Sequence, residues 1–104
     1  MVYSQIQQYE LADRIMRAVC EVGQVTFMEL CSAVKNVKIN TLRGVYCLIS
    51  RGYCIHPSRA ASLICRSRQN VINQARKYSQ YIQIRDKYTL SIYNRIIDLL
   101  HNNN

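Results

Sequence analysis

The sequence predicts one mainly α-helical domain with a small set of β-strands, spanning residues 1–104. Three observations support this fold class. Apolar residues recur at helical spacing in several segments, helix-capping residues separate those segments, and short stretches are rich in residues that favour strands. The chain is 49% hydrophobic with one proline and three glycines, a composition typical of a globular protein rather than a disordered one.

The first two helices are predicted from apolar spacing and capping residues. Residues 5–21 form the first helix, and Gly23 follows at a position suited to a helix C-cap. Thr26 and Glu29 have the spacing of a capping box, which predicts a second helix over about residues 27–34. The apolar residues expected to be buried are Leu11, Ile15, Met16, Val19 and Cys20 in the first helix and Phe27, Leu30, Cys31 and Val34 in the second.

A third helix is predicted over residues 41–51, with Asn40 as its N-cap and Gly52 at its end. Its inward face would consist of Leu42, Val45 or Tyr46, and Ile49. The opposite side of this helix would then face solvent, with Asn40, Thr41, Arg43, Gly44 and Cys47 on it.

The β-prone stretches lie in the second half of the chain. Residues 53–56 predict a short strand closed by Pro57. Residues 81–85 and 88–90 predict two further strands joined by a turn. Such a pair would form a small β-wing beside the helices.

Two helices are predicted around these strands. Residues 67–80 predict one helix, with a looser lead-in over residues 58–66. Ser91 caps a last helix over residues 91–101, whose apolar residues almost surround it. A helix of that kind is expected to be buried on more than one side.

The distribution of charge points to a polyanionic partner. The formal net charge is +8, and no acidic residue occurs between Glu29 and Asp86. At physiological ionic strength charges are screened only beyond about 8 Å, so a stretch of one sign repels itself and attracts the opposite sign. Nucleic-acid phosphates fit this field best. The basic residues of the stretch are Lys35, Lys38, Arg43, Arg51, Arg59, Arg66, Arg68, Arg76, Lys77 and Arg85.

Three stretches resemble the winged helix-turn-helix family: residues 24–30 (QVTFMEL), residues 39–53 (INTLRGVYCLISRGY) and residues 87–91 (KYTLS). They are similar to the start of the family's second helix, to its recognition helix and to its closing wing strand. The resemblance implies a helix-turn-helix core at residues 9–56, a basic insert at 57–80, wing strands at 81–90 and a C-terminal helix at 91–101.

The resemblance also implies that the third helix enters the major groove of double-stranded DNA, which accepts one α-helix. Arg43 could then contact guanine, and Asn40 or Thr41 could reach a base edge or a phosphate. Gly44 costs about 1 kcal/mol relative to alanine within a helix, so its backbone would approach either DNA or a neighbouring helix. The predicted DNA-binding residues are Lys38, Asn40, Thr41, Arg43, Gly44, Cys47, Arg59, Arg66, Arg68, Arg76 and Lys77.

The long insert departs from the family, whose wing strands are joined by only a few residues. Its basic residues would contact phosphates or enter the minor groove. Two alternatives stay open: a packing helix with a solvated basic face, and a domain that is entirely helical.

The C-terminal third is rich in tyrosine and apolar residues. Aromatic rings beside arginines can stack on unpaired bases of single-stranded nucleic acid. The sequence favours instead a role for these rings in the core and in a subunit interface. A homodimer is expected, with Tyr93, Ile96, Ile97 and Leu100 at its interface.

Catalysis, cofactors and metals find little support in the sequence. It contains no paired carboxylates, no nucleophile motif and no glycine-rich phosphate loop, so we expect no enzyme and no cofactor. The five cysteines include no Cys-x-x-Cys pair and are expected to be reduced. A metal site built from Cys54, His56 and Cys65 is the alternative. No apolar stretch approaches the roughly 20 residues that a membrane span needs, and a cytoplasmic protein is expected.

The sequence therefore predicts a regulator of transcription of bacterial or phage type that binds specific double-stranded DNA. The alternative is a small non-enzymatic protein that binds and modulates another protein, such as a transcription component, through its basic face.

Overall fold

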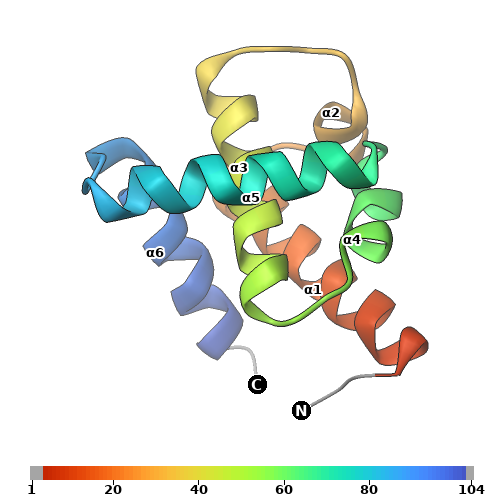
Figure 1. Ribbon diagram of the computed structural model, residues 1–104. Coiled ribbons are helices and arrows are strands. Elements are labelled where there is room, and N and C mark those ends of the chain that lie inside the picture. The colour runs from red at the N-terminus through yellow and green to blue at the C-terminus, as the bar shows by residue number, and fades with distance from the viewer. Residues whose placement is uncertain (1–3, 103–104) are drawn as a thin grey trace.

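The computed structural model describes residues 4–102 of the protein, and these residues form helices and no strands (Figure 1). In chain order the helices are α1 (Gln5–Gly23), α2 (Phe27–Cys31), α3 (Val37–Gly52), α4 (Pro57–Ile64), α5 (Arg68–Gln83) and α6 (Lys87–Asn102). The predicted β-wing, and with it the winged helix-turn-helix fold class, is therefore wrong. The entirely helical alternative is the observed architecture.

The first three helices begin at side-chain caps. Ser4 and Gln7 form a capping box at the start of α1, in which the Gln7 N–H donates to Ser4 Oγ at 3.2 Å. The predicted box at α2 is confirmed, because the Glu29 N–H donates to Thr26 Oγ1 at 3.1 Å. The cap of α3 is Asn36 rather than Asn40, so this helix begins a full turn earlier than predicted.

The predicted first wing strand is a turn that leads into α4. His56 is the N-cap of α4, and its Nδ1 accepts the Ser58 N–H at 3.2 Å. Pro57 occupies the first position of the helix, where its missing N–H costs nothing and its fixed φ favours a helix. The β-prone composition of residues 53–56 was thus outweighed by a strong start signal for a helix.

The second pair of predicted strands is absent for a similar reason. Helix α5 continues through most of residues 81–85 and ends at Gln83. Asp86 then caps α6, because its Oδ2 accepts both the N–H of Thr89 at 3.0 Å and the Thr89 hydroxyl at 2.7 Å. Two helices that meet at a short turn replace the expected hairpin.

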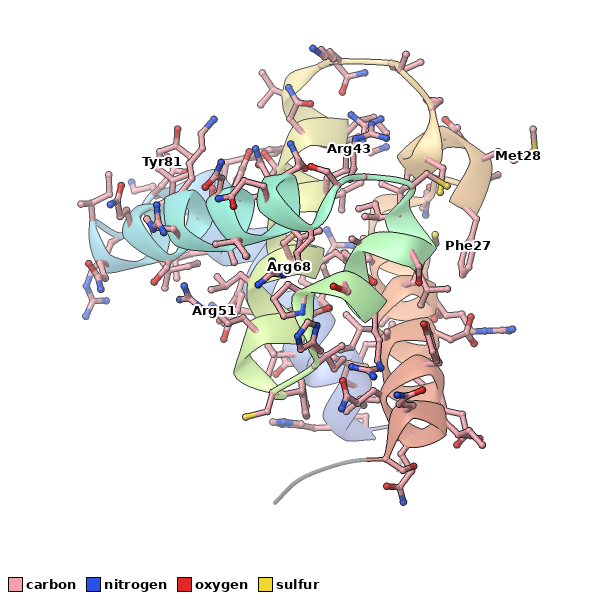
Figure 2. All side chains as sticks on the ribbon, turned by 45° about the vertical axis from the view of Figure 1, so that its right-hand side comes forward. Phe27, Met28, Arg43, Arg51, Arg68 and Tyr81 are labelled. Carbon is pink, nitrogen blue, oxygen red and sulfur yellow. The ribbon has the colours of Figure 1, made fainter. Side chains whose placement is uncertain are left out.

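Helix α2 is shorter than predicted and less buried. Leu30 is fully buried, whereas Phe27 is 36% and Met28 83% exposed. Figure 2 shows the side chains of Phe27 and Met28 pointing away from the body of the molecule. Val34, also expected inside, lies in the exposed turn after α2.

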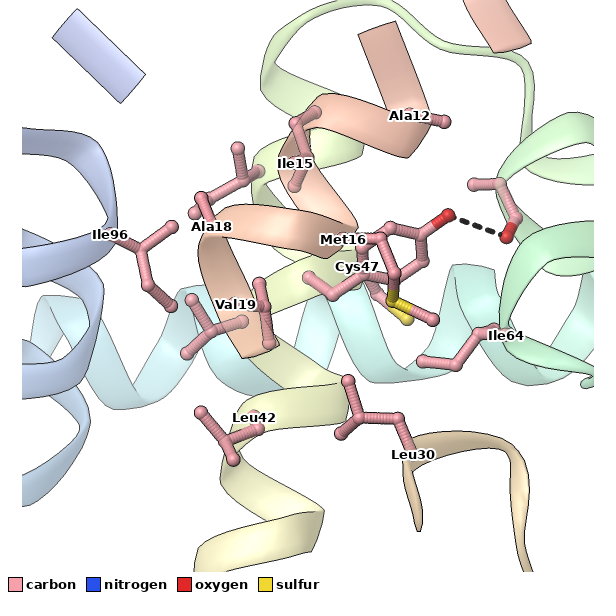
Figure 3. Close-up of a cluster of buried hydrophobic side chains, with 14 of the residues drawn as sticks. Ala12, Ile15, Met16, Ala18, Val19, Leu30, Leu42, Cys47, Ile64 and Ile96 are labelled. Carbon is pink, nitrogen blue, oxygen red and sulfur yellow. Dashed lines mark hydrogen bonds between the residues drawn. The ribbon is translucent and has the colours of Figure 1, made fainter. Parts of the chain in front are cut away.

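Helix α3 lies at the centre of the packing. It contacts α1 on one side, and α5 crosses it on the other (Figure 1). The core that results joins residues from every helix, and Figure 3 shows Met16 and Val19 of α1 facing Leu42 and Cys47 of α3. The hydroxyl of the buried Tyr46 donates to the Ala60 carbonyl at 2.8 Å, which ties α3 to α4.

Helix α6 packs against α1, α3 and α5 of its own chain. Ile96 is completely buried and Leu100 is 6% exposed, so neither is available to a second subunit. Tyr93 and Ile97 are half-buried and pack against the same core. Two of the four predicted interface residues, Ile96 and Leu100, thus belong to the core of the same chain, which corrects their assignment.

Among residues 4–102, no helix combines the length and the apolar character needed to cross a membrane.

Candidate functional site

The side of α3 that was expected to enter a DNA groove is covered by α5. Thr41, Gly44 and Cys47 are buried. The ring of Tyr78, from α5, lies directly over Gly44, where an added methyl group would overlap it. Of the two explanations for this glycine, close approach of a neighbouring helix is therefore confirmed. The expectation that the polar side of α3 is open to a partner is wrong.

Arg43 is 7% exposed and acts as a structural clamp. Its guanidinium has five N–H donors, and five acceptors surround it. They are the carbonyls of Leu30 (2.7 Å), Val34 (2.8 Å), Glu29 (3.2 Å) and Ser32 (2.7 Å), and Asn40 Oδ1 (3.4 Å). These bonds hold α2 and the turn after it against α3. Arg43 has no donor left for a base, which corrects its predicted role in reading DNA.

A second guanidinium lies against the first. Arg66 Nη2 donates to the Ser32 carbonyl at 2.7 Å, the same oxygen that Arg43 binds. Arg66 Nη1 donates to the carbonyls of Cys31 and Cys65, both at 3.2 Å. Desolvation by burial, with the nearby charge of Arg66, lowers the pKa of Arg43. Within the described part of the chain neither guanidinium has a carboxylate at ion-pair distance, so positive charge accumulates here uncompensated.

The two guanidiniums border a groove of about 650 Å³ between α3 and α5. The turn before α3 closes one end, and the start of α6 closes the other. Most of the groove side chains fall into three chemical classes: the cations Lys35, Arg43, Arg66 and Lys77, the amides Asn40, Asn70 and Gln74, and the rings Tyr78, Tyr81 and Tyr88. The others are Val37, Thr41, Asp86 and Thr89. Cations, amides and exposed rings are the groups that bind phosphates and bases.

One face of α5 supplies most of the long wall of the groove. Asn70, Gln74, Lys77 and Tyr81 follow one another at spacings of four, three and four residues, and they extend over about 16 Å at 1.5 Å per residue. Lys77 Nζ lies 5.8 Å from the ring centroid of Tyr78 and 5.9 Å from that of Tyr81. Figure 2 places Tyr81 and Arg43 on the same side of α5. Lys77 and the half-buried Tyr81 thus form one surface, next to the buried ring of Tyr78.

Asp86 is the acidic residue of the groove lining. Its hydrogen bonds from the Thr89 side chain and then the Thr89 N–H lower its pKa. The carboxylate is therefore ionised at neutral pH. It lies at the start of α6, where its negative charge interacts favourably with the helix dipole. Four cations against this one carboxylate leave the groove with a surplus of positive charge.

The predicted DNA-binding residues are distributed over several surfaces. Asn40, Thr41, Arg43, Arg66 and Lys77 line the groove, although Thr41 and Arg43 are buried in its floor. Lys38 and Arg68 are exposed outside it, Arg59 is half-buried on α4, and Arg76 lines a second cavity on α5. The sequence reasoning missed Lys35, Asn70, Gln74, Tyr81 and Tyr88. The polar stripe on α5 was the signal for three of them, because its spacing places them on one helix face.

Comparisons with protein-family models, with curated proteins and with solved structures each gave no match to this chain. Among residues 4–102 no group of three or more His, Cys, Asp and Glu side chains is placed to hold a metal ion, and all five cysteines are free thiols. The alternative metal site at Cys54, His56 and Cys65 is therefore not formed.

Proposed function

We propose that this protein binds nucleic acid, and that the α3–α5 groove holds a single strand. The observation that carries the proposal is the convergence of uncompensated cations, amides and tyrosine rings in one groove. A positive channel lined by rings is the general solution for binding unpaired nucleotides.

Each class of side chain has a distinct role in this proposal. Arg66 keeps its Nε–H and one Nη2–H beyond the three bonds described above, and with Lys35 and Lys77 it binds phosphates. Tyr88 is 43% exposed and Tyr81 half-buried, so bases stack on their open faces. The side-chain amides of the groove then form hydrogen bonds with base edges, both as donors and as acceptors.

In this proposal α3 does not contact the base pairs of duplex DNA. The side of that helix that would meet base edges is buried under α5, with Tyr78 over Gly44. Duplex DNA would meet only the exposed cations, through its phosphates and without base readout. A role in regulation would then follow from the binding of unpaired strands.

The test is a titration of short fluorescent oligonucleotides, single-stranded and duplex, at several salt concentrations. Three phosphate contacts to a single strand predict a slope of log affinity against log salt of about −2, at about 0.7 per contact. Lys77→Gln should reduce the slope by about 0.7. Tyr81→Ala should cost about 1–3 kcal/mol for the lost stacking of one base.

Arg95→Gln is the matched control, because Arg95 is exposed on α6 and does not line the groove. It removes the same charge from the whole protein and should leave the slope nearly unchanged. Equal losses in Lys77→Gln and Arg95→Gln, or tighter binding of the duplex, would contradict the assignment to the groove.

A second candidate is binding of another protein, and one observation favours it. Phe27 and Met28 of α2, Val34 of the following turn and Val37 at the start of α3 are exposed apolar residues, and Lys35 and Lys38 are their neighbours in the chain. A surface of this kind suits a partner that is apolar with an acidic border. If no oligonucleotide binds at low salt, this function is preferred. A partner held by the wild type and by Arg95→Gln, but lost from Met28→Ser, would then support it.

A further inference from the structure

A second cavity lies on the other side of α5 from the groove. It has a volume of about 320 Å³ and opens between the end of α3, the start of α4 and the middle of α5. None of its lining residues lines the groove. Its walls are mainly apolar, and they come from Ile55, Pro57, Ala60, Val71, Ile72 and Ala75. The volume is at the lower end of the range for small-molecule sites.

The cavity contains one buried hydroxyl that is poorly satisfied. Ser50 is 1% exposed, and among residues 4–102 its Oγ has no partner within hydrogen-bond distance, although the Tyr46 hydroxyl lies near enough to interact with it. A buried hydroxyl without a well-formed hydrogen bond is unfavourable, and a ligand atom that bonds it removes this cost. Cys47, the other buried polar group of the wall, brings no negative charge, because burial raises the pKa of its thiol to about 12.

The mouth of the cavity carries donors and positive charge. Arg51 and Arg76 are both exposed at its border. His56 Nδ1 already accepts the Ser58 N–H, so the neutral imidazole has its proton on Nε2 and offers a further donor. Among the residues that the structure describes, no carboxylate lines this cavity. The combination of an apolar interior with a cationic mouth selects for a ligand of complementary shape and charge.

We propose that this cavity binds a small organic anion with an apolar body and a terminal carboxylate. The apolar body fills the space between Val71, Ile72 and Ala75, the carboxylate meets Arg51 and Arg76, and one carboxylate oxygen accepts a hydrogen bond from the Ser50 hydroxyl. A volume equal to about ten water molecules fits a ligand of about that many non-hydrogen atoms. This site is independent of the nucleic-acid groove and goes beyond the function proposed for it.

The experiment follows backbone amide shifts in the NMR spectrum of the full-length protein while phenylacetate or hexanoate is added, without nucleic acid. We expect saturable shifts in residues 50–57 and 71–76 at millimolar ligand or below. Phenylacetamide, which keeps the ring and loses the charge, should bind at least tenfold more weakly. The double variant Arg51→Gln/Arg76→Gln should lose at least tenfold in affinity for both anions, and both substituted residues are exposed, so the fold is not perturbed.

Arg95→Gln serves again as the charge-matched control and should bind the anions as the wild type does. Ser50→Ala should weaken phenylacetate binding severalfold while leaving the protein folded. The proposal is overturned if neither anion shifts these two segments, or if phenylacetamide binds as tightly as phenylacetate. It is also overturned if the double variant and Arg95→Gln lose affinity equally. Because no nucleic acid is present, none of these outcomes depends on the groove.

Discussion

Gly44→Ala tests the packing of α5 over α3, which buries Thr41, Gly44 and Cys47. A β-carbon at this position would overlap the Cγ, Cδ2 and Cε2 atoms of the Tyr78 ring. The ring is 5% exposed and held between α3 and its edge-to-face contact with Tyr81, whose centroid lies 5.0 Å away. The overlap includes Cγ, which is next to the backbone of α5, so the whole ring and not only its tip has to shift.

The expected change in the free energy of unfolding follows from two opposed effects. Alanine gains about 1 kcal/mol over glycine within a helix. Overpacking a well-packed site costs about 1–3 kcal/mol, and the overlap with a rigid ring places this site at the upper end. The net result is a loss of about 1–2 kcal/mol in the free energy of unfolding. For a domain of this size, that lowers the melting temperature by about 5–15 °C.

The assay is urea and thermal denaturation followed by circular dichroism, carried out as a double-mutant cycle with Tyr78→Ala. In the Tyr78→Ala background all three overlapping ring atoms are removed, so Gly44→Ala should become neutral or stabilising by up to about 1 kcal/mol. If Gly44→Ala alone raises the stability of the wild type by that amount, the ring does not cover Gly44 and the buried α3 face is refuted.

Three further outcomes are expected. Arg43→Met should lower the free energy of unfolding by about 3 kcal/mol or more in urea denaturation, because four backbone carbonyls lose a charged donor; a loss below about 0.5 kcal/mol would contradict the clamp. Iodoacetamide at mildly alkaline pH should modify the exposed Cys54 quickly and leave Cys47, with its pKa raised to about 12 by burial, unmodified until the protein unfolds; mass spectrometry identifies the sites. The pKa of Asp86 is lowered by its hydrogen bonds from Thr89, so its stabilising contribution is complete above the usual value of 3.8 and is lost as the pH falls through the lowered value. Asp86→Asn should therefore make the free energy of unfolding fall less steeply as the pH is lowered. An unchanged pH dependence would contradict the role of Asp86 as a helix cap.

Much of the local structure could be read from the sequence, because caps and apolar spacing act within a few residues. The capping box of Thr26 and Glu29, the helix that became α1 and the helix that became α5 were all predicted within a few residues of their ends. The strands were mispredicted where β-prone composition competed with a start signal. His56 and Asp86 cap helices, and each signal outweighed the composition around it.

The candidate site could be predicted only in part. The acid-free basic stretch is evident in the sequence, and it contains Lys35, Arg66 and Lys77 of the groove. Whether a basic side chain can bind a partner or is held by hydrogen bonds within the fold depends on the backbone carbonyls around it. Arg43 and Arg66 are the same residue type. All five guanidinium N–H donors of Arg43 are hydrogen-bonded, whereas those of Arg66 are not all used.

The sequence alone determined that the chain is strongly basic and where most of its helices lie, since charge is a sum over residues and caps are local. Only the tertiary structure decided which side of α3 is covered, because that depends on Tyr78, more than thirty residues away from Gly44, crossing over it. Packing between distant segments follows from shape complementarity across the whole fold, and short-range patterns do not encode it. For the same reason the groove and the second cavity appear only once α5 is in place across α3.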